Sequence, residues 1–184
     1  MLTWIRLAAL TLTALTMGLS FAHVLEMPAK LVYPPDLYIA LQNSLYAYFG
    51  PPNLGAFVEP GAILAVVILA YQGRHRRPAF RLTLGAALCL LVAFPLVFVV
   101  FTQPANEVFQ AARPASVPAN FEAYRDQWEF SHAGRFVLHL AGFAFLTLSV
   151  LVRPRAPRTE LSPYTLGAIP SARGERSYSA PSSR

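Results

Sequence analysis

Residues whose side chains suit proton transfer or metal binding gather at two places in a sequence that is otherwise short of charge. His23 and Glu26 close one long apolar run, and Glu129, His132 and Arg135 open another. Residues three or four positions apart share one face of an α-helix, so each group is expected to point in a single direction. Histidine beside carboxylates is typical both of general acid–base catalysis and of metal binding. Three interpretations of these residues are open.

The first interpretation is a metal site. A His-x-x-Glu segment on one helix and a Glu-x-x-His segment on another resemble half of the carboxylate-bridged di-metal site of helical bundles. The candidate ligands are His23, Glu26, Glu129 and His132. The complete pattern needs further carboxylates, and Glu59 and Glu107 are the acids available for that role.

The second interpretation is a redox pocket, and the sequence itself requires no cofactor for it. His132 would act as the general base on a hydrophobic phenol or quinol. Arg135 and Asn106 would stabilise the negative charge that develops on the substrate oxygen. The catalytic candidates are therefore His132, Arg135, Asn106 and Glu129, with His23 and Glu26 as orienting partners.

The third interpretation is structural. Glu26, Glu129 and Arg135 would pair with one another, because unpaired charges inside a membrane protein are costly. The histidines would hydrogen-bond to the backbone or to hydroxyl groups on a neighbouring helix, such as those of Thr13 and Thr16. The cluster would then hold helices together without doing chemistry.

The elements that must position these residues are membrane-spanning helices. Of the 184 residues, 55% are hydrophobic and 13% are charged, whereas soluble domains carry about 25% charged residues. Four apolar segments are long enough to cross a bilayer core of about 30 Å, where each must be helical: residues 2–24, 54–71, 82–101 and 130–152. We therefore predict an all-α integral membrane four-helix bundle. His139 would lie about 10 Å deeper in the membrane than His132, because a helix rises about 1.5 Å per residue.

The basic residues indicate how these helices are oriented. Arg6, the connection 72–81 and the tail after residue 152 together carry a net charge of +9, and the two other connections together carry −3. Because positive charge accumulates on the cytoplasmic side, we predict a multi-pass protein of the inner membrane with both termini cytoplasmic. The net charge of +6 is therefore explained by the orientation of the helices in the membrane, and no nucleic-acid partner is expected. The expected partners are membrane lipid and a lipophilic small molecule.

Several segments between and beside the spans have patterns of their own. A proline pair precedes Asp36, and the apolar residues of 37–49 fall on one face, which predicts a helix capped by Asp36 in the outer membrane interface. Pro95 predicts a kink in the third span. Residues 20–22 resemble a signal-peptide cleavage site, but the apolar run is longer than a signal core, so we expect the first span to be retained. The tail 153–184 is rich in Arg, Pro and Ser, which predicts a disordered basic cytoplasmic segment.

Four segments resemble one known family. They are residues 17–28, residues 41–46 with 49–50, the Pro-Ala-Asn turn at 104–106 and the Trp-Glu-x-x-His-x-x-Arg pattern within 125–135. These segments are similar to the small four-span membrane proteins related to fungal anthrone oxygenases. The resemblance covers roughly residues 5–152. It implies a four-helix membrane fold with a polar cluster at the outer end of the helices. The fungal branch acts on polyketide anthrones, so the resemblance also implies oxidation of a lipophilic aromatic compound.

Two functions follow as expectations. One is an anthrone oxygenase-like oxidoreductase that acts on a lipophilic aromatic or quinol substrate at a polar pocket in the outer leaflet. The alternative is a non-enzymatic membrane accessory or lipid-binding subunit whose polar cluster is structural.

Overall fold

The computed structural model describes residues 2–50, 52–112 and 116–152, and the predicted tail 153–184 lies outside them. The elements are α1 (Leu2–Lys30), α2 (Pro35–Asn43), the 3₁₀ helix η1 (Tyr46–Phe49), α3 (Gly55–Gly73), α4 (Arg77–Leu91), the π-helix η2 (Val92–Thr102), α5 (Gln103–Ala111) and α6 (Phe121–Leu151). Because α4, η2 and α5 are continuous, they form one long helical segment. Four segments are thus long and apolar enough to cross a membrane. The prediction of an all-α fold with four long apolar helices is confirmed.

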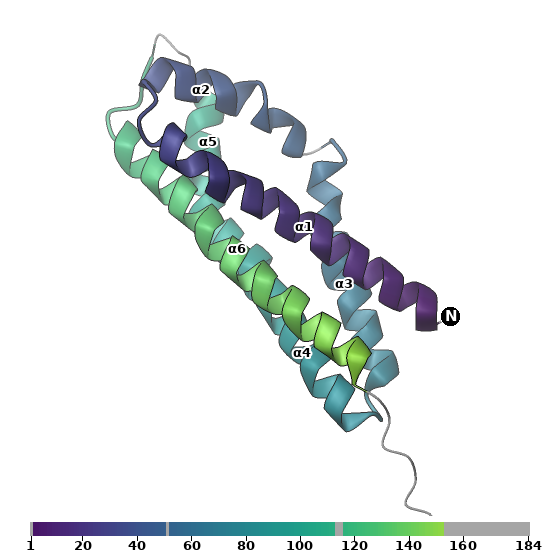
Figure 1. Ribbon diagram of the computed structural model, residues 1–184. Coiled ribbons are helices and arrows are strands. Elements are labelled where there is room, and N and C mark those ends of the chain that lie inside the picture. The colour runs from purple at the N-terminus through teal and green to yellow at the C-terminus, as the bar shows by residue number, and fades with distance from the viewer. Residues whose placement is uncertain (1, 51, 113–115, 153–184) are drawn as a thin grey trace, which may run out of the picture. The chain divides into compact units, whose positions relative to one another are not determined.

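The four long segments pack side by side in a ring. α6 contacts α1 and α4, and α3 also contacts both α1 and α4. In Figure 1, α2 and α5 lie at the end of the molecule where α1 finishes and α6 starts. We call this end the cap end. The first turn of α1 and the last turn of α6 lie at the opposite end, which we call the basic end because Arg6, Arg76 and Arg77 belong to it.

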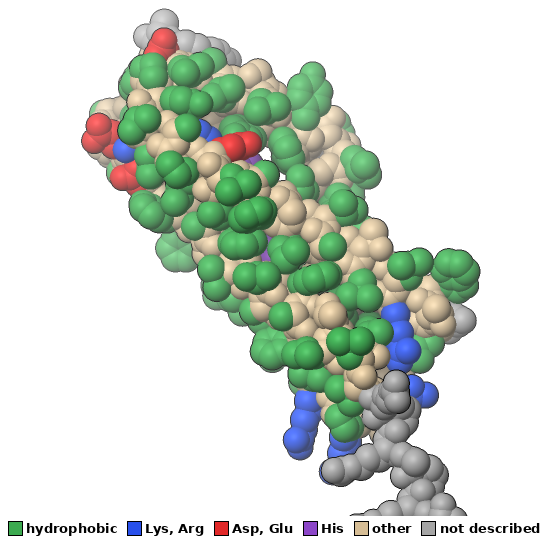
Figure 2. Space-filling view, viewed as in Figure 1, with side chains coloured by type: hydrophobic (Ala, Val, Ile, Leu, Met, Phe, Trp, Pro, Cys, Tyr) green, Lys and Arg blue, Asp and Glu red, His purple; other side chains and the backbone are tan. Residues whose placement is uncertain are grey.

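Apolar side chains cover the outer faces of the helices, while small residues lie between them. Figure 2 shows hydrophobic side chains spread over most of the visible face. The core near the basic end is built from Ala9, Ala62, Ala65, Val66, Leu69, Ala86, Ala87, Leu90 and Leu146. A Cβ atom placed on Gly142 of α6 would lie 3.3 Å from Cβ of Cys89 on α4. Such close backbone approach through small residues, with larger apolar residues facing outward, is typical of helices packed in lipid.

The third long segment changes its geometry around Pro95. Proline has no N–H group, so it cannot donate the usual hydrogen bond inside an α-helix. The irregularity predicted there takes the form of the π-helix η2, which runs over Val92–Thr102. π-Helical geometry is rare beyond one turn and is frequent at functional sites. Here η2 brings the rings of Phe94 and Phe98, stacked 5.2 Å apart, to the interior cavity described below.

The predicted helix over 37–49 is divided in two, and its predicted cap is wrong. α2 starts at Pro35 with Pro34 at the N-cap position, and no side chain caps it. Proline fits the first turn of a helix because its fixed φ is already helical, so the proline pair, not Asp36, sets the start. A turn at Ser44 separates α2 from η1. The exposed side chains of this region are still apolar, among them Leu37, Leu45 and Tyr48.

A mostly aromatic cluster packs α2 against α5 and α6 at the cap end. Its members are Tyr38, Ile39, Ala105, Phe109, Ala112, Phe121 and Trp128. Between this cluster and the alanine-rich core, the buried side chains are polar: Ser20 and His23 on α1, Glu59 on α3, and His132, Arg135 and His139 on α6. The fold therefore holds a polar layer between two apolar ones, and the candidate site lies in that layer.

Candidate functional site

A cavity of about 670 Å³ opens in the polar layer. It is lined from α1, α2, η1, α3, η2, α5 and α6, so it lies inside the helix packing. Its apolar walls include Leu19, Phe49, Phe94, Phe98, Phe109 and Trp128. Its polar lining includes Ser20, His23, Gln42, Glu59, Gln103, Asn106, His132 and Arg135. The volume falls in the range of about 300–1,000 Å³ that is usual for small-molecule sites.

His132 is held by the backbone of its own helix in a defined protonation form. Its Nδ1 atom lies 2.9 Å from the carbonyl oxygen of Trp128. A carbonyl only accepts hydrogen bonds, so Nδ1 carries the hydrogen and Nε2 keeps a free lone pair in neutral His132. The imidazole packs on the Trp128 ring with centroids 3.9 Å apart and against the His23 ring at 4.4 Å. Nε2 forms no hydrogen bond with the described residues, which leaves it available to a molecule in the cavity.

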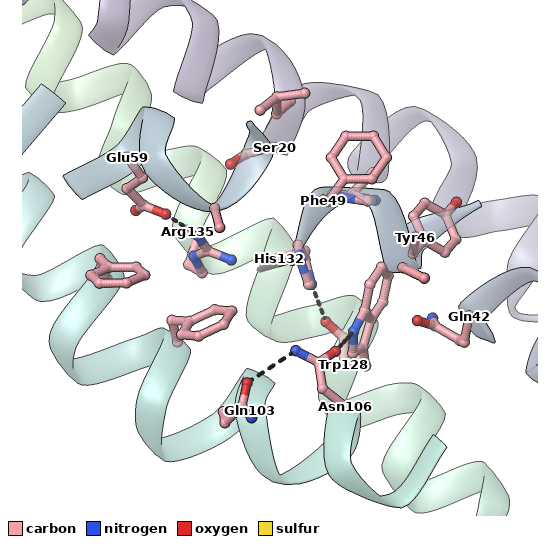
Figure 3. A pocket seen from close by; sticks show the side chains of 18 of the residues that line it. Ser20, Gln42, Tyr46, Phe49, Glu59, Gln103, Asn106, Trp128, His132 and Arg135 are labelled. Carbon is pink, nitrogen blue, oxygen red and sulfur yellow. Dashed lines mark hydrogen bonds and ion pairs between the residues drawn. The ribbon is translucent and has the colours of Figure 1, made fainter. Parts of the chain in front are cut away.

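Arg135 is paired with Glu59 across the cavity (Figure 3). The other oxygen of the same carboxylate lies 2.7 Å from Nε2 of His139. Nδ1 of His139 in turn lies 2.8 Å from the Ser20 hydroxyl. The guanidinium carbon of Arg135 is 5.0 Å from the ring centroid of Phe98, a cation–π distance. These contacts join α1, α3, η2 and α6 around one buried cation.

A second ion pair lies nearer the cap end, next to the cavity but not in its lining. Nζ of Lys30 is 2.9 Å from the carboxylate of Glu129, and the Tyr38 hydroxyl donates to the same oxygen at 2.9 Å. Burial and the adjacent Glu129 carboxylate raise the pKa of Tyr38 far above its usual range, so the hydroxyl remains a donor. Lys30 also lies 4.1 Å from the Trp128 ring centroid. Glu129 thus contacts the cavity wall indirectly, because it pairs with Lys30, which lies over the Trp128 ring.

Glu26 lies one helical turn after His23 and is bound by a tyrosine of η1. It accepts a hydrogen bond from the Tyr46 hydroxyl, and it lies 3.7 Å from Nδ1 of His23 and 3.8 Å from Nζ of Lys30. Burial, followed by the bond to Glu26, raises the pKa of Tyr46 well above its usual range. The Tyr46 ring packs against the rings of His23 and Trp128 at 5.1 and 5.4 Å. η1 is therefore bonded to α1 through Tyr46, and Phe49 of the same element also lines the cavity.

Asn106 supports the opposite wall. Its amide oxygen accepts a 2.7 Å hydrogen bond from the indole nitrogen of Trp128. Its amide nitrogen lies 3.5 Å from the side-chain oxygen of Gln103, a long and weak contact. In Figure 3, dashed lines join Gln103 to Asn106, Asn106 to Trp128 and His132 to Trp128, and Arg135 lies further along the cavity.

The structure brings together four of the six predicted site residues in the cavity lining: His23, Asn106, His132 and Arg135. Glu26 and Glu129 lie behind that lining and contact it through other side chains. No group of three or more His, Cys, Asp or Glu side chains within the described ranges is arranged to hold a metal ion. The acidic candidates for a metal are instead bound to Lys30, Tyr38 and Tyr46.

The pairing expected by the structural interpretation is wrong in its partners. Arg135 pairs with Glu59, not with Glu26 or Glu129. The hydroxyl group bound to a histidine is that of Ser20, whereas the Thr16 hydroxyl donates to its own helix at Leu12. Sequence reasoning also missed the roles of Lys30 and Tyr38. Lys30 could have been found from its position four residues after Glu26, whereas Tyr38 lies on a separate element and gave no such signal.

Three buried polar atoms of the cavity-lining residues have no hydrogen-bond partner among the described residues. They are Nδ1 of His23, Nε2 of Gln42 and Nε of Arg135. Buried polar groups are nearly always paired, so such groups indicate a site completed by water or by a ligand. The free Nε2 of His132 adds a proton acceptor to these unpartnered groups between aromatic walls.

These features define a helical protein with four membrane-length helices and a polar cavity inside their packing. The family model described as anthrone oxygenase matches residues 53–145, which is half of the chain. The protein belongs to the anthrone oxygenase family. The match spans α3 to α6 and contains Glu59, Asn106, His132 and Arg135, while α1, with Ser20 and His23, lies outside it. Comparisons with curated proteins and with solved structures found no match.

Proposed function

We propose that the protein is an anthrone oxygenase-like oxidoreductase that acts on a lipophilic aromatic or quinol substrate in the main cavity. The observation that supports this most is the free Nε2 of His132, which faces a cavity that also contains the Arg135 guanidinium. A base and a cation between aromatic walls suit a substrate that loses a proton and becomes an aromatic anion. The description of the family as anthrone oxygenase suggests the reaction class, oxidation of such a compound by molecular oxygen.

The chemistry of an anthrone assigns a role to each of these groups. An anthrone has a ring CH₂ group activated by a ring carbonyl, and removal of one of its protons gives an enolate with negative charge on oxygen. His132 would accept that proton at Nε2, and Arg135 would stabilise the enolate oxygen. Molecular oxygen is the oxidant. Overall, the CH₂ group and O₂ become a second ring carbonyl and one molecule of water, so atoms and electrons balance.

The other predicted residues would position these two. Asn106 would fix the Trp128 indole and offer its weakly engaged amide N–H groups to the substrate. Glu129 would hold Lys30 against the Trp128 ring, and Glu26 would hold η1 in place through Tyr46, whose ring packs against His23. Because Glu26 and Glu129 do not line the cavity, we assign them orientation and not a chemical step.

Membrane placement follows the same proposal. The basic end would face the cytoplasm with both termini, which would place the cavity toward the outer leaflet of the inner membrane. Exposed Trp4 and Tyr71 at the basic end suit the membrane–water boundary. A lipophilic substrate would then reach the cavity from the lipid phase, and membrane lipid would be the surrounding partner.

Turnover by purified full-length protein tests the function. In nanodiscs, O₂ uptake and quinone absorbance would be followed with an anthrone probe, after subtraction of the rate without protein. We expect His132→Gln to lower kcat by about 10²–10⁴-fold, the usual contribution of a general base, because an amide group cannot accept a proton at neutral pH. The matched control is His75→Gln, because His75 is exposed in the turn between α3 and α4. Equal turnover by His132→Gln and the control would contradict the assignment.

One observation favours the non-enzymatic alternative. The buried ion pairs join separate helices and satisfy Glu59 and much of Glu129, as a purely structural network would. An accessory or lipid-binding subunit would show no turnover of any anthrone or quinol probe, and His132→Gln would change only its thermal stability. That result would replace the oxidoreductase proposal with this one.

A further inference from the structure

A second, smaller cavity lies at the basic end, away from the polar layer. Its volume is about 90 Å³. It is formed by the first turns of α1, the last turn of α3, the start of α4 and the end of α6, so one cavity touches all four long segments. The polar residues that line it are Arg6, Gln72, Arg76, Thr83 and Ser149.

The charge at this cavity is positive and uncompensated. Arg6 and Arg76 form no ion pair with any carboxylate among the described residues. The connection 72–81 contains four arginines and no acid. Figure 2 shows basic side chains without acidic neighbours at this end, whereas at the other end basic and acidic side chains lie together. Two guanidinium groups beside one cavity repel each other unless an anion lies between them.

The available hydrogen-bond donors narrow the chemistry of that anion. The Thr83 and Ser149 hydroxyls already donate to backbone carbonyls, at 2.9 and 2.7 Å. The side-chain donors left are therefore the guanidinium groups and the Gln72 amide, and guanidinium groups match the oxygens of a phosphate in pairs. A cavity of about 90 Å³ admits a tetrahedral anion but not an acyl chain.

The position of the cavity agrees with the depth of lipid headgroups. Trp4 is 72% exposed and Tyr71 is 66% exposed, both close in sequence to lining residues. Amphipathic aromatic side chains of this kind mark the membrane–water boundary. A phosphate bound here would therefore lie at the level where phospholipids present theirs.

We propose that this cavity is a binding site for a phosphate-bearing anion, held by Arg6, Gln72 and Arg76. The shared chemistry is the phosphate group, which either an anionic phospholipid headgroup or free inorganic phosphate can supply. Bound there, the anion would bridge α1, the last turn of α3 and the turn that precedes α4, and would stabilise their packing. The site is independent of the main cavity and of any reaction in it.

Quenching of Trp4 by brominated lipid tests the phospholipid source. The chain has two tryptophans, and Trp128 is 2% exposed whereas Trp4 is accessible. In phosphatidylcholine nanodiscs, brominated phosphatidylglycerol is expected to quench Trp4 more than the same fraction of brominated phosphatidylcholine. Loss of one guanidinium, in Arg6→Gln or Arg76→Gln, should lower this preference about tenfold, the factor expected when one charge-assisted hydrogen bond to the phosphate is lost.

The matched control is Arg74→Gln, which removes the same charge from the same turn. Arg74 donates to the Tyr71 carbonyl at 2.8 Å and lies over the Tyr71 ring, outside the cavity lining. Equal losses of preference in all three variants would show general attraction to the basic end and would overturn the site. The free-ion source is tested by the melting temperature in phosphatidylcholine nanodiscs: a rise with inorganic phosphate that Arg6→Gln abolishes supports the site with that ligand. No lipid preference and no phosphate response would also overturn it.

Discussion

Replacing Glu59 by Gln removes one negative charge from the polar layer while keeping the shape of the side chain. The carboxylate is buried, with 9% of its side chain exposed, and it accepts from Arg135 and lies 2.7 Å from His139. The amide oxygen of Gln could still accept from Arg135. Its N–H could donate to Nε2 of His139 if the ring carried its hydrogen on Nδ1, facing the Ser20 hydroxyl. The substitution therefore tests charge with the hydrogen bonds retained.

The expected cost follows from the cation left behind. Removing one partner of a buried ion pair destabilises a protein by about 3–5 kcal/mol, because the remaining charge is uncompensated. The Phe98 ring, 5.0 Å from the Arg135 guanidinium, partly compensates that charge, so we expect a loss of about 2–4 kcal/mol. For a chain of this length, this corresponds to a fall in Tm of roughly 5–15 °C.

Thermal unfolding in detergent, followed by near-UV circular dichroism, measures this loss. Glu122→Gln is the matched control, because Glu122 is an exposed acid on α6. The double variant Glu59→Gln/Arg135→Gln places two neutral amides in the same space and is expected to recover most of the stability. If Glu59→Gln has the same Tm as the control, the ion pair does not hold the helices as argued. The same conclusion follows if the losses of stability in Glu59→Gln alone and in Arg135→Gln alone simply add in the double variant.

Two other substitutions test the cap over the cavity. A Cβ on Gly55 would lie 2.8 Å from backbone atoms of η1, so Gly55→Ala must displace η1. The displacement should weaken binding of an anthrone probe at least about threefold, by roughly 0.6 kcal/mol or more. The control is Gly134→Ala, where a Cβ would have nothing within 4 Å, and equal affinities of the two variants would refute the role of η1. Tyr38→Phe removes one donor from the buried Glu129 carboxylate and should cost about 1–3 kcal/mol. Its Tm should fall below that of Tyr48→Phe, an exposed tyrosine, and identical melting curves would show that Glu129 does not need this bond.

The positions of the long helices could be predicted from the sequence because lipid imposes a simple rule. A long apolar segment in a bilayer must be helical, so composition alone places α1, α3, α4 with η2, and α6. Periodicity then places His132 and Arg135 on one face of α6, and both line the same cavity. The ends were less predictable, since α1 continues to Lys30 with its charged residues paired on the inside.

The partners within the polar layer could not be predicted, because they depend on how far each helix is shifted along its neighbour. Glu59 was available in the sequence only as an extra acid near the start of a span. Whether it meets Arg135 depends on the position of α3 along α6, and a shift of one or two helical turns, about 5–10 Å, would separate the two side chains. The division of 37–49 into α2 and η1 could not be predicted either, because it depends on packing against α5 and α6, which no local sequence pattern indicates.

The buried network and the cavity are best understood together. A purely structural cluster would be expected to fill its space, as the alanine-rich core near the basic end does. Glu59, His139 and Ser20 satisfy one another, yet beside them His132 keeps an unbonded Nε2 and Arg135 keeps an unpartnered Nε, in the lining of a cavity of about 670 Å³. Pairing among the surrounding charges fixes these two groups in place. It follows that the ion pairs are the scaffold of the proposed site, and that removing them should disturb turnover and stability together.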